Sequence, residues 1–204
     1  MNDDAEDHEE SRDAGASDAD GESADPESLA EESPAAAFEQ VSELSGTHLR
    51  AAEFWEDIVA DMEATAEEYE AEGWETLQLH PGDVTPLVPD GEGDDDFGID
   101  VLVPDDEFGE LESLLEGGIS FDSYEAFRAT ADSLVLLVVA MEDPDAQLAV
   151  LYPAYYDAES AQSMLAAAER AGEMRSYVRT LTNDRIEFTH REPENFARPT
   201  ATGE

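Results

Sequence analysis

The sequence of 204 residues has no cysteine and no lysine. Without cysteine the chain can form no disulfide bond, and it offers no thiol nucleophile or thiolate ligand for zinc. All nine basic residues are arginine and 54 residues are acidic, so the formal net charge at pH 7 is −45. Because the phosphate backbone of nucleic acids is itself negative, this charge predicts that the protein binds no nucleic acid.

Common motifs of nucleotide-binding, metalloprotease and hydrolase sites are also absent. The sequence contains no GxxxxGK[ST] or GxGxxG turn, no HExxH and no GxSxG. The apolar run Leu134–Met141 has only eight residues, whereas a helix that spans a bilayer needs about 20. Residues 1–33 lack the basic and apolar segments of a signal peptide. We therefore expect a cytoplasmic protein with no cofactor and no membrane association.

Hydrophobic residues nevertheless make up 41% of the chain, with eight phenylalanines, six tyrosines and two tryptophans. This content is sufficient for a folded core, but the charge is unevenly distributed. Residues 1–33 hold 14 acids and one arginine, and segments of this composition stay unfolded because they have little apolar surface to bury. We predict a disordered acidic N-terminal tail at 1–33, a single domain at 34–192 and a flexible C-terminal tail at 193–204.

The folded part must tolerate repulsion between its own carboxylates. A helix predicted over 50–72 places acids four residues apart in the pairs Glu53/Asp57, Asp57/Asp61, Glu63/Glu67 and Glu68/Glu72. Each such pair destabilises a helix by about 0.2–0.5 kcal/mol, and salt at 1 M shortens the screening length to about 3 Å. In its lack of lysine and its abundance of Asp and Glu, the whole chain resembles cytosolic proteins of haloarchaea. The resemblance implies a salt-rich cytoplasm and a small uncharacterised family, and it implies no activity.

Hydrophobic periodicity predicts three helical segments and a set of short strands. Apolar residues three and four apart predict helical structure over 34–72, either as one helix or as two divided at Gly46-Thr47, and similar spacing predicts helices within 105–118 and over 158–171. Short apolar or alternating runs between turn residues predict strands at 74–79, 84–88, 97–103, 120–131, 134–141, 147–152, 174–182 and 185–190. The segment 120–131 also fits a short helix, and we favour the strand. Pro86 restricts the run at 84–88 to an edge strand or to no strand.

The fold class follows from the order of these elements. Neighbouring strands joined by tight turns favour antiparallel pairing over a doubly wound parallel sheet. The run Leu134–Met141 is apolar at every position, which is typical of a strand covered on both faces. We predict an α+β fold with a mostly antiparallel or mixed sheet and helices packed on one face.

The C-terminal hairpin carries the most unusual group of side chains. Six of the nine arginines lie in the last 35 residues. A two-residue turn at 183–184 pairs Tyr177 with His190 and places Arg175 and Arg179 on the same face. These four residues are a candidate anion- or ligand-binding site, because arginine donates two parallel hydrogen bonds to a carboxylate or phosphate. In the alternative interpretation the arginines pair with the protein's own acids and Tyr177 packs in the core.

Metal binding and catalysis have weaker support. The acidic loop at 89–96 has Asp95 where an EF-hand needs glycine, and Val101 stands at the position of its bidentate glutamate. We expect a hydrated loop that attracts cations only loosely. The four histidines share no metal-ligand spacing; they are His8, His48, His80 and His190. We predict no metal site and no catalytic residue.

Two functional hypotheses follow. The first is a non-enzymatic domain that acts through protein interaction or ligand sensing, with an unknown protein partner or a second copy of itself. The strand edges at 84–88 and in the C-terminal hairpin are the surfaces for such self-association. The second is a small enzyme or anion-binding domain whose site unites Arg179, Tyr177, His190 and a carboxylate. A deep pocket that joins these groups favours the second hypothesis, and a flat surface favours the first.

Overall fold

The computed structural model describes residues 34–89 and 96–199, and within residues 34–50 it describes the backbone only. Its helices are α1 (Pro34–Ala71), α2 (Asp105–Glu116), α3 (Gln162–Ala171) and the short 3₁₀ helix η1 (Pro193–Asn195). No helix in these ranges is long and apolar enough to cross a membrane. The predicted disordered tail at 1–33 lies outside the described residues, as do positions 90–95 and 200–204.

The strands form two mixed sheets, and the predicted α+β fold is confirmed. Sheet A has the order β1-β6-β5-β4 and sheet B the order β2-β3-β7-β8. Sheet A contains β1 (Glu75–Gln78), β6 (Leu148–Asp157), β5 (Leu134–Asp143) and β4 (Ser123–Ala131). Sheet B contains β2 (Asp83–Leu87), β3 (Gly98–Leu102), β7 (Glu173–Arg179) and β8 (Arg185–Arg191). The pairs β1–β6 and β3–β7 are parallel, and the other four pairs are antiparallel.

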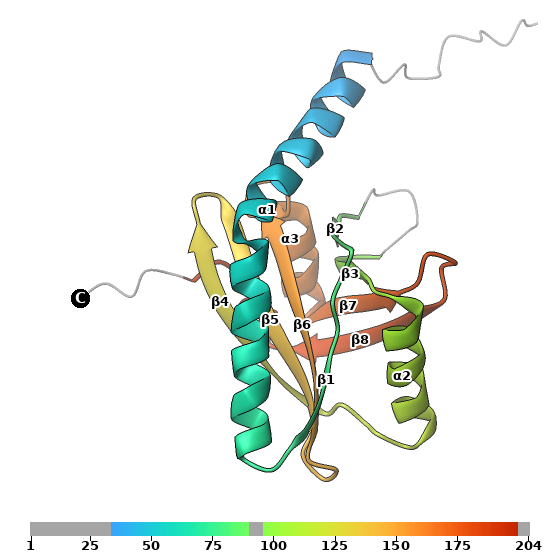
Figure 1. Ribbon diagram of the computed structural model, residues 1–204. Helices are drawn as coiled ribbons and strands as arrows, with labels where there is room; N and C mark the ends of the chain where they lie inside the picture. The colour runs from blue at the N-terminus through green and yellow to red at the C-terminus, as the bar shows by residue number, and fades with distance from the viewer. Residues whose placement is uncertain (1–33, 90–95, 200–204) are drawn as a thin grey trace, which may run out of the picture.

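Sheet A is covered on both faces, as Figure 1 shows. Helix α1 packs along one face, over β1, β5 and β6. On the other face the β7–β8 hairpin runs across the strands of sheet A, and α3 packs against β7. All ten residues of β6 are buried, and so are Leu134–Met141 of β5. The prediction that this apolar run is covered on both faces is confirmed, and the physical reason is that it has helix on one side and sheet on the other.

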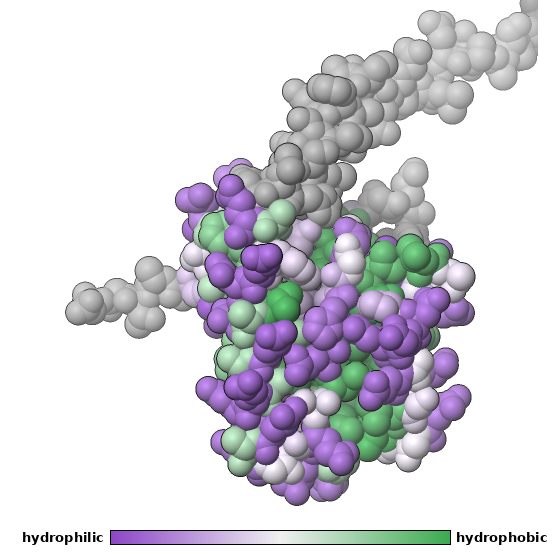
Figure 2. All heavy atoms as spheres, viewed as in Figure 1, coloured by the Kyte–Doolittle hydropathy of each residue, from purple (hydrophilic) through white to green (hydrophobic). Residues whose placement is uncertain are grey.

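The C-terminal end of α1 is fixed on sheet A by one tyrosine. The Tyr69 hydroxyl donates a hydrogen bond to Glu142 at 2.5 Å and lies 3.4 Å from a carboxylate oxygen of Glu125. The ring of Trp74 packs edge-on against Tyr69, with 5.4 Å between ring centres. Gly73 ends the helix with a φ of +94°, a conformation that glycine adopts without strain. These contacts hold α1 along the sheet with its polar residues outward, and Figure 2 shows hydrophilic side chains over much of this face.

Close approach of β3 and β7 requires glycine at position 98. Gly98 has a φ of +135°, and a Cβ atom there would lie 2.2 Å from the carbonyl oxygen of Arg175. Any side chain would therefore push the two strands apart. Pairing of β3 with β7 in turn connects β2 to the rest of sheet B. Strand β2 contains Pro86 and forms the edge of this sheet.

The segment predicted as a flexible C-terminal tail is packed against the domain at its beginning. Phe196 is 0% exposed, and its carbonyl accepts a hydrogen bond of 2.5 Å from the Tyr156 hydroxyl. The guanidinium of Arg128 donates to the carbonyl oxygens of Glu194 and Ala197, at 2.6 and 3.0 Å. The core therefore extends past residue 192 and includes Phe196.

Replacing Phe196 tests whether this segment belongs to the core. Deleting a fully buried aromatic side chain typically costs about 3–5 kcal/mol, so Phe196→Ala should lower the free energy of unfolding by that amount. Urea unfolding in molar salt measures it. Leu181→Ala is the control, because Leu181 is 82% exposed and its loss should change stability by less than about 0.5 kcal/mol. Equal stabilities of the two variants would show that the C-terminal segment adds nothing to the core.

Candidate functional site

The β7–β8 hairpin has a different register from the one predicted. Asn183 adopts a φ of +67°, its N–H donates to the Thr180 carbonyl at 3.2 Å, and the Thr180 N–H donates to Asp184 at 3.0 Å. This is a three-residue loop, not the expected two-residue turn. Tyr177 therefore pairs with Glu187 instead of His190.

This change of register divides the predicted four-residue cluster. The pairing moves by three residues, and an odd shift exchanges the two faces of a strand. Arg175, Tyr177 and Arg179 alternate along β7 and share one face of sheet B. His190 pairs with Met174 and bonds to Ser176, so it lies on the opposite face. His190 lines one pocket, whereas Arg179 and Arg185 line another.

The arginines of this face already have carboxylate partners. Arg179 Nε lies 2.5 Å from Asp100 Oδ1, and Arg185 Nη2 lies 2.7 Å from Asp96 Oδ2. Arg185 also sits over the ring of Tyr177, 3.6 Å from its centre. Arg175 pairs with Glu173 at 3.0 Å. An incoming anion must compete with these carboxylates, which supports the interpretation that the arginines neutralise the protein's own acids.

His190 lies between the two sheets as a neutral side chain. Its Nε2 is 2.6 Å from Ser176 Oγ, and its ring contacts the rings of Tyr124 and Phe196 at centre distances of 4.8 and 5.2 Å. Burial lowers the pKa of His190 to about 4. Ser176 is 0% exposed, so this Ser–His pair does not present its hydroxyl to a substrate from solvent. The geometry supports a role in packing the two sheets together.

The described residues also show no group of acids and histidines suited to a metal ion. Of the acidic loop at 89–96, positions 90–95 lie outside the described residues, and Asp96 is paired with Arg185. His80, the other histidine with a defined side chain, bonds to Glu107 through both its backbone N–H and its Nδ1, at 2.6 and 2.9 Å. It thereby connects the turn before β2 to the first turn of α2.

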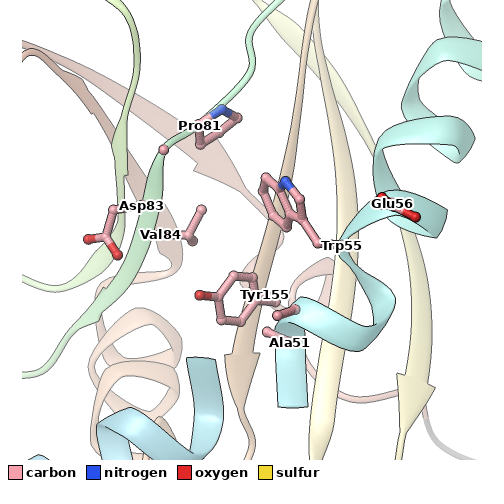
Figure 3. A pocket seen from close by; sticks show the side chains of 9 residues that line it. Ala51, Trp55, Glu56, Pro81, Asp83, Val84 and Tyr155 are labelled. Atoms are coloured by element: carbon pink, nitrogen blue, oxygen red, sulfur yellow. The ribbon is translucent and has the colours of Figure 1, made fainter. Parts of the chain in front are cut away.

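A small pocket lies elsewhere, between α1, β6 and the turn that leads into β2 (Figure 3). Its volume is about 360 Å³. The rings of Trp55 and Tyr155 meet edge-to-face, with 5.9 Å between their centres. Nine residues line it: Ala51, Ala52, Trp55, Glu56, Pro81, Gly82, Asp83, Val84 and Tyr155. We call this the aromatic pocket.

Alternation along β6 and spacing along α1 place the two rings. Tyr155 pairs with Leu136 and points to the α1 face of sheet A, whereas its neighbour Tyr156 points to the other face, where it reaches Phe196. Trp55 follows Ala51 by one helical turn, and the small buried Ala51 leaves space beside the rings. In Figure 3 Val84 and Pro81 lie across the cavity from α1.

The electrostatics of the aromatic pocket favour positive charge. Glu56 and Asp83 are its charged side chains, and its lining includes no arginine or histidine. Asp83 Oδ2 accepts a hydrogen bond from the Thr85 hydroxyl at 3.0 Å. Burial, together with the charge of Asp83, raises the pKa of Tyr155 to about 12, so the phenol stays neutral at physiological pH. Aromatic faces attract cations, and the two carboxylates disfavour an anion.

Sequence reasoning placed Trp55 on the apolar stripe of the first helix, but it did not place Tyr155, which lies beyond the strand predicted at 147–152. Trp55 belongs to the apolar stripe of a helix, and Tyr155 follows the apolar run of a strand 100 residues later. A periodic pattern shows which face is buried, but it does not show which helix covers which strand. The signal in the sequence was a large aromatic residue at each of these two positions, where an aliphatic residue would fill a core equally well.

The buried histidine makes a specific contribution to the pH dependence of stability. The unfolded chain binds a proton at His190 below pH 6.5, whereas the folded chain does so only near pH 4. Stability is therefore lost as pH falls through this window, by about 2 kcal/mol between pH 7.5 and pH 5. Urea unfolding of the wild type and His190→Asn at both pH values, in the same salt, isolates this effect because both proteins retain the same carboxylates. The same pH dependence in both proteins would contradict the assignment.

Comparison with known proteins shows to which family this chain belongs. A model of a family of unknown function, DUF7529, matches residues 40–198, which is well over half of the chain. No curated protein and no solved structure matches it. The chain therefore belongs to DUF7529, a family of unknown function.

Proposed function

We propose that this protein binds a small organic cation in the aromatic pocket. The observation that carries the proposal is the composition of the lining: the rings of Trp55 and Tyr155 meet there, beside two carboxylates and no basic side chain. A cation within about 6 Å of a tryptophan ring centre is attracted by the negative face of the ring. Figure 3 shows both rings at the cavity, with Glu56 and Asp83 at its sides.

The size and the remaining lining define the ligand further. A volume of about 360 Å³ lies at the lower end of the range of about 300–1,000 Å³ that is usual for small-molecule sites. Val84 and Ala51 add apolar side chains to the lining. These properties suit an ammonium group with alkyl substituents, whose positive charge is spread over an apolar surface.

Salt determines which of these interactions matters most. At molar salt the screening length is about 3 Å, so attraction by the exposed Glu56 is largely lost. Contact with Trp55 and Tyr155 is less affected, because the ligand and the rings exclude water from each other. We therefore assign most of the affinity to the rings and a smaller part to the carboxylates.

An enzyme or anion-binding site at the C-terminal hairpin has less support. Its predicted residues are Arg175, Tyr177, Arg179 and His190. The arginines face away from the histidine, and Arg175 and Arg179 are paired with Glu173 and Asp100. The hypothesis of a domain that senses a ligand has a pocket to act through, whereas the hypothesis of catalysis at the hairpin lacks an assembled group of residues.

Titration with matched probes tests the proposal. Tetramethylammonium and choline are the cationic probes, and 3,3-dimethylbutanol is the neutral isostere of choline; calorimetry measures the dissociation constants. Choline should bind at least tenfold more tightly than the alcohol, and Trp55→Leu should weaken choline binding about tenfold, since the contact is worth about 1–2 kcal/mol.

Trp74→Phe is the control for this titration, because Trp74 packs on Tyr69 away from the aromatic pocket. It should leave choline binding unchanged. Equal affinity for choline and its neutral isostere, or an unchanged affinity in Trp55→Leu, would overturn the proposal.

The acidic surface supports a salt-rich cytoplasm as the setting in which the protein works. The acids of the like-charge pairs on α1 and in the turn just after it are all exposed: Glu53, Asp57, Asp61, Glu63, Glu67, Glu68 and Glu72. Because nothing but solvent and ions screens them, their repulsion falls as salt rises. A repulsion that falls as salt rises fits the salt-rich cytoplasm that the resemblance to haloarchaeal proteins implies.

Neutralising one of these acids tests the role of salt. Asp57→Asn removes two like-charge pairs and should raise the free energy of unfolding by about 0.4–1 kcal/mol in 0.1 M KCl. In 2 M KCl the gain should disappear, since the repulsion is already screened. Asp57→Glu is the matched control, because it keeps the charge and should show no gain at either concentration. Urea unfolding measures both, and a gain of the same size in both salts would contradict the electrostatic explanation.

A further inference from the structure

Helix α1 leaves the outer strand of sheet A partly open. It packs mainly on β1, β5 and β6, whereas β4 lies beyond β5 at the edge of the sheet (Figure 1). Between α1 and the β4–β5 pair runs a groove of about 530 Å³. It lies over the face of the sheet and not beside its edge, so an occupant would contact side chains without extending the sheet.

The floor of this groove is apolar. In β4 and β5, Phe127 pairs with Val138 and Ala129 with Leu136, so these four side chains share the face toward α1. Phe127 is 43% exposed, which is unusual for a phenylalanine. From the helix side Phe54 and Ile58 complete the floor.

The helix wall of the groove is acidic. Asp57, Asp61 and Glu68 all line it, and separations of four and seven residues place them on one stripe of α1. No basic side chain among the described residues forms an ion pair with any of the three. Arg128 borders the groove, but its guanidinium donates to the carbonyls of Glu194 and Ala197.

We propose that this groove binds an amphipathic helix of a partner protein that carries apolar residues on one face and arginine or lysine along one flank. The apolar face would cover Phe127 and its neighbours, and the basic flank would meet the acidic stripe of α1. The lining of α1 extends from Phe54 to Glu68, which is about 21 Å along a helix axis. A partner helix of about four turns matches this length.

Charge favours a basic partner helix over three other occupants of the groove: a second copy of the chain, residues 1–33 and a nucleic acid. A second copy of the chain would bring its own acids to the acidic stripe, since the net charge of each copy is −45. The protein's own residues 1–33 carry one arginine and 14 acids, a net charge of −13, and are repelled for the same reason. Phosphate groups of a nucleic acid are repelled as well. A basic, amphipathic segment is the one that both the floor and the wall attract.

Two designed peptides test the proposal with the full-length protein. Both are 16-residue helices with leucine and alanine on one face; one carries arginine on the flank, and the other carries glutamate at the same positions. Fluorescence anisotropy in 0.3 M KCl measures binding of labelled peptide. The arginine peptide should bind at least tenfold more tightly than the glutamate peptide, and the difference should shrink in 2 M KCl because exposed charge pairs are screened.

Variants locate the binding surface. Phe127→Asp should weaken binding of the arginine peptide at least tenfold, and the double variant Asp57→Asn, Asp61→Asn about threefold or more. Leu181→Asp is the matched control, because Leu181 is an exposed apolar residue on the distant β7–β8 loop and should leave binding unchanged. Trp55→Leu should also leave it unchanged, which separates this groove from the aromatic pocket.

Three results would overturn the proposal. Equal binding of the two peptides would remove the role of the acidic stripe. Unchanged binding in Phe127→Asp would show that the peptide binds elsewhere. If Phe127→Asp does not fold, unchanged binding in the variant Asp57→Asn, Asp61→Asn would show the same. Sedimentation velocity of the wild type in 2 M KCl decides the remaining case: a dimer that Phe127→Asp converts to a monomer would assign the groove to a second copy.

Discussion

Burial of β5 and β6 on both faces is the constraint on which the rest of the structure depends. Because neither β5 nor β6 has an exposed face, a layer must pack on each side of the two strands. Helix α1 forms one of these layers and sheet B forms the other. Alternation along β6 then directs Tyr155 toward the helix and Tyr156 toward the C-terminal segment. The aromatic pocket and the anchor for Phe196 are thus two results of the same buried strand.

The distribution of charge follows from this arrangement. Among the described residues only three acids are buried, Asp100, Asp143 and Asp157. Several of the arginines are used in pairs with Asp96, Asp100 and Glu173. Carboxylates on α1 and at the start of β2 are left without a basic partner among the described residues. The same excess of acid that makes the isolated helix unfavourable in dilute salt therefore leaves the pocket and the groove selective for cations. Apolar and aromatic contacts must provide the affinity that salt removes.

The sequence allowed the elements to be predicted more reliably than their contacts. The run Leu134–Met141 identified a strand covered on both faces, and Pro86 correctly restricted its strand to an edge, because both inferences depend only on local chemistry. The predicted register of the hairpin was wrong, because Asn183 takes a left-handed conformation that lengthens the loop by one residue and exchanges the faces of β8. The burial of Phe196 was not predicted, because a single buried aromatic residue after a proline gives no periodic pattern of apolar residues. The aromatic pocket required knowing which helix covers β6, and no residue pattern contains that information.

The two parallel pairs have a kinetic consequence. Glu75 of β1 pairs with Leu148, and Ile99 of β3 pairs with Ser176, so each pairing joins segments more than 70 residues apart in the chain. Non-local pairings of this kind close long loops before any stabilising contact forms, and they are typical of slow-folding proteins. During that delay the apolar strands are open to neighbouring chains, which is when aggregation usually begins. Mutual repulsion between highly negative chains keeps them apart at this stage. The same charge that destabilises the folded helix therefore reduces aggregation while the sheets are still forming.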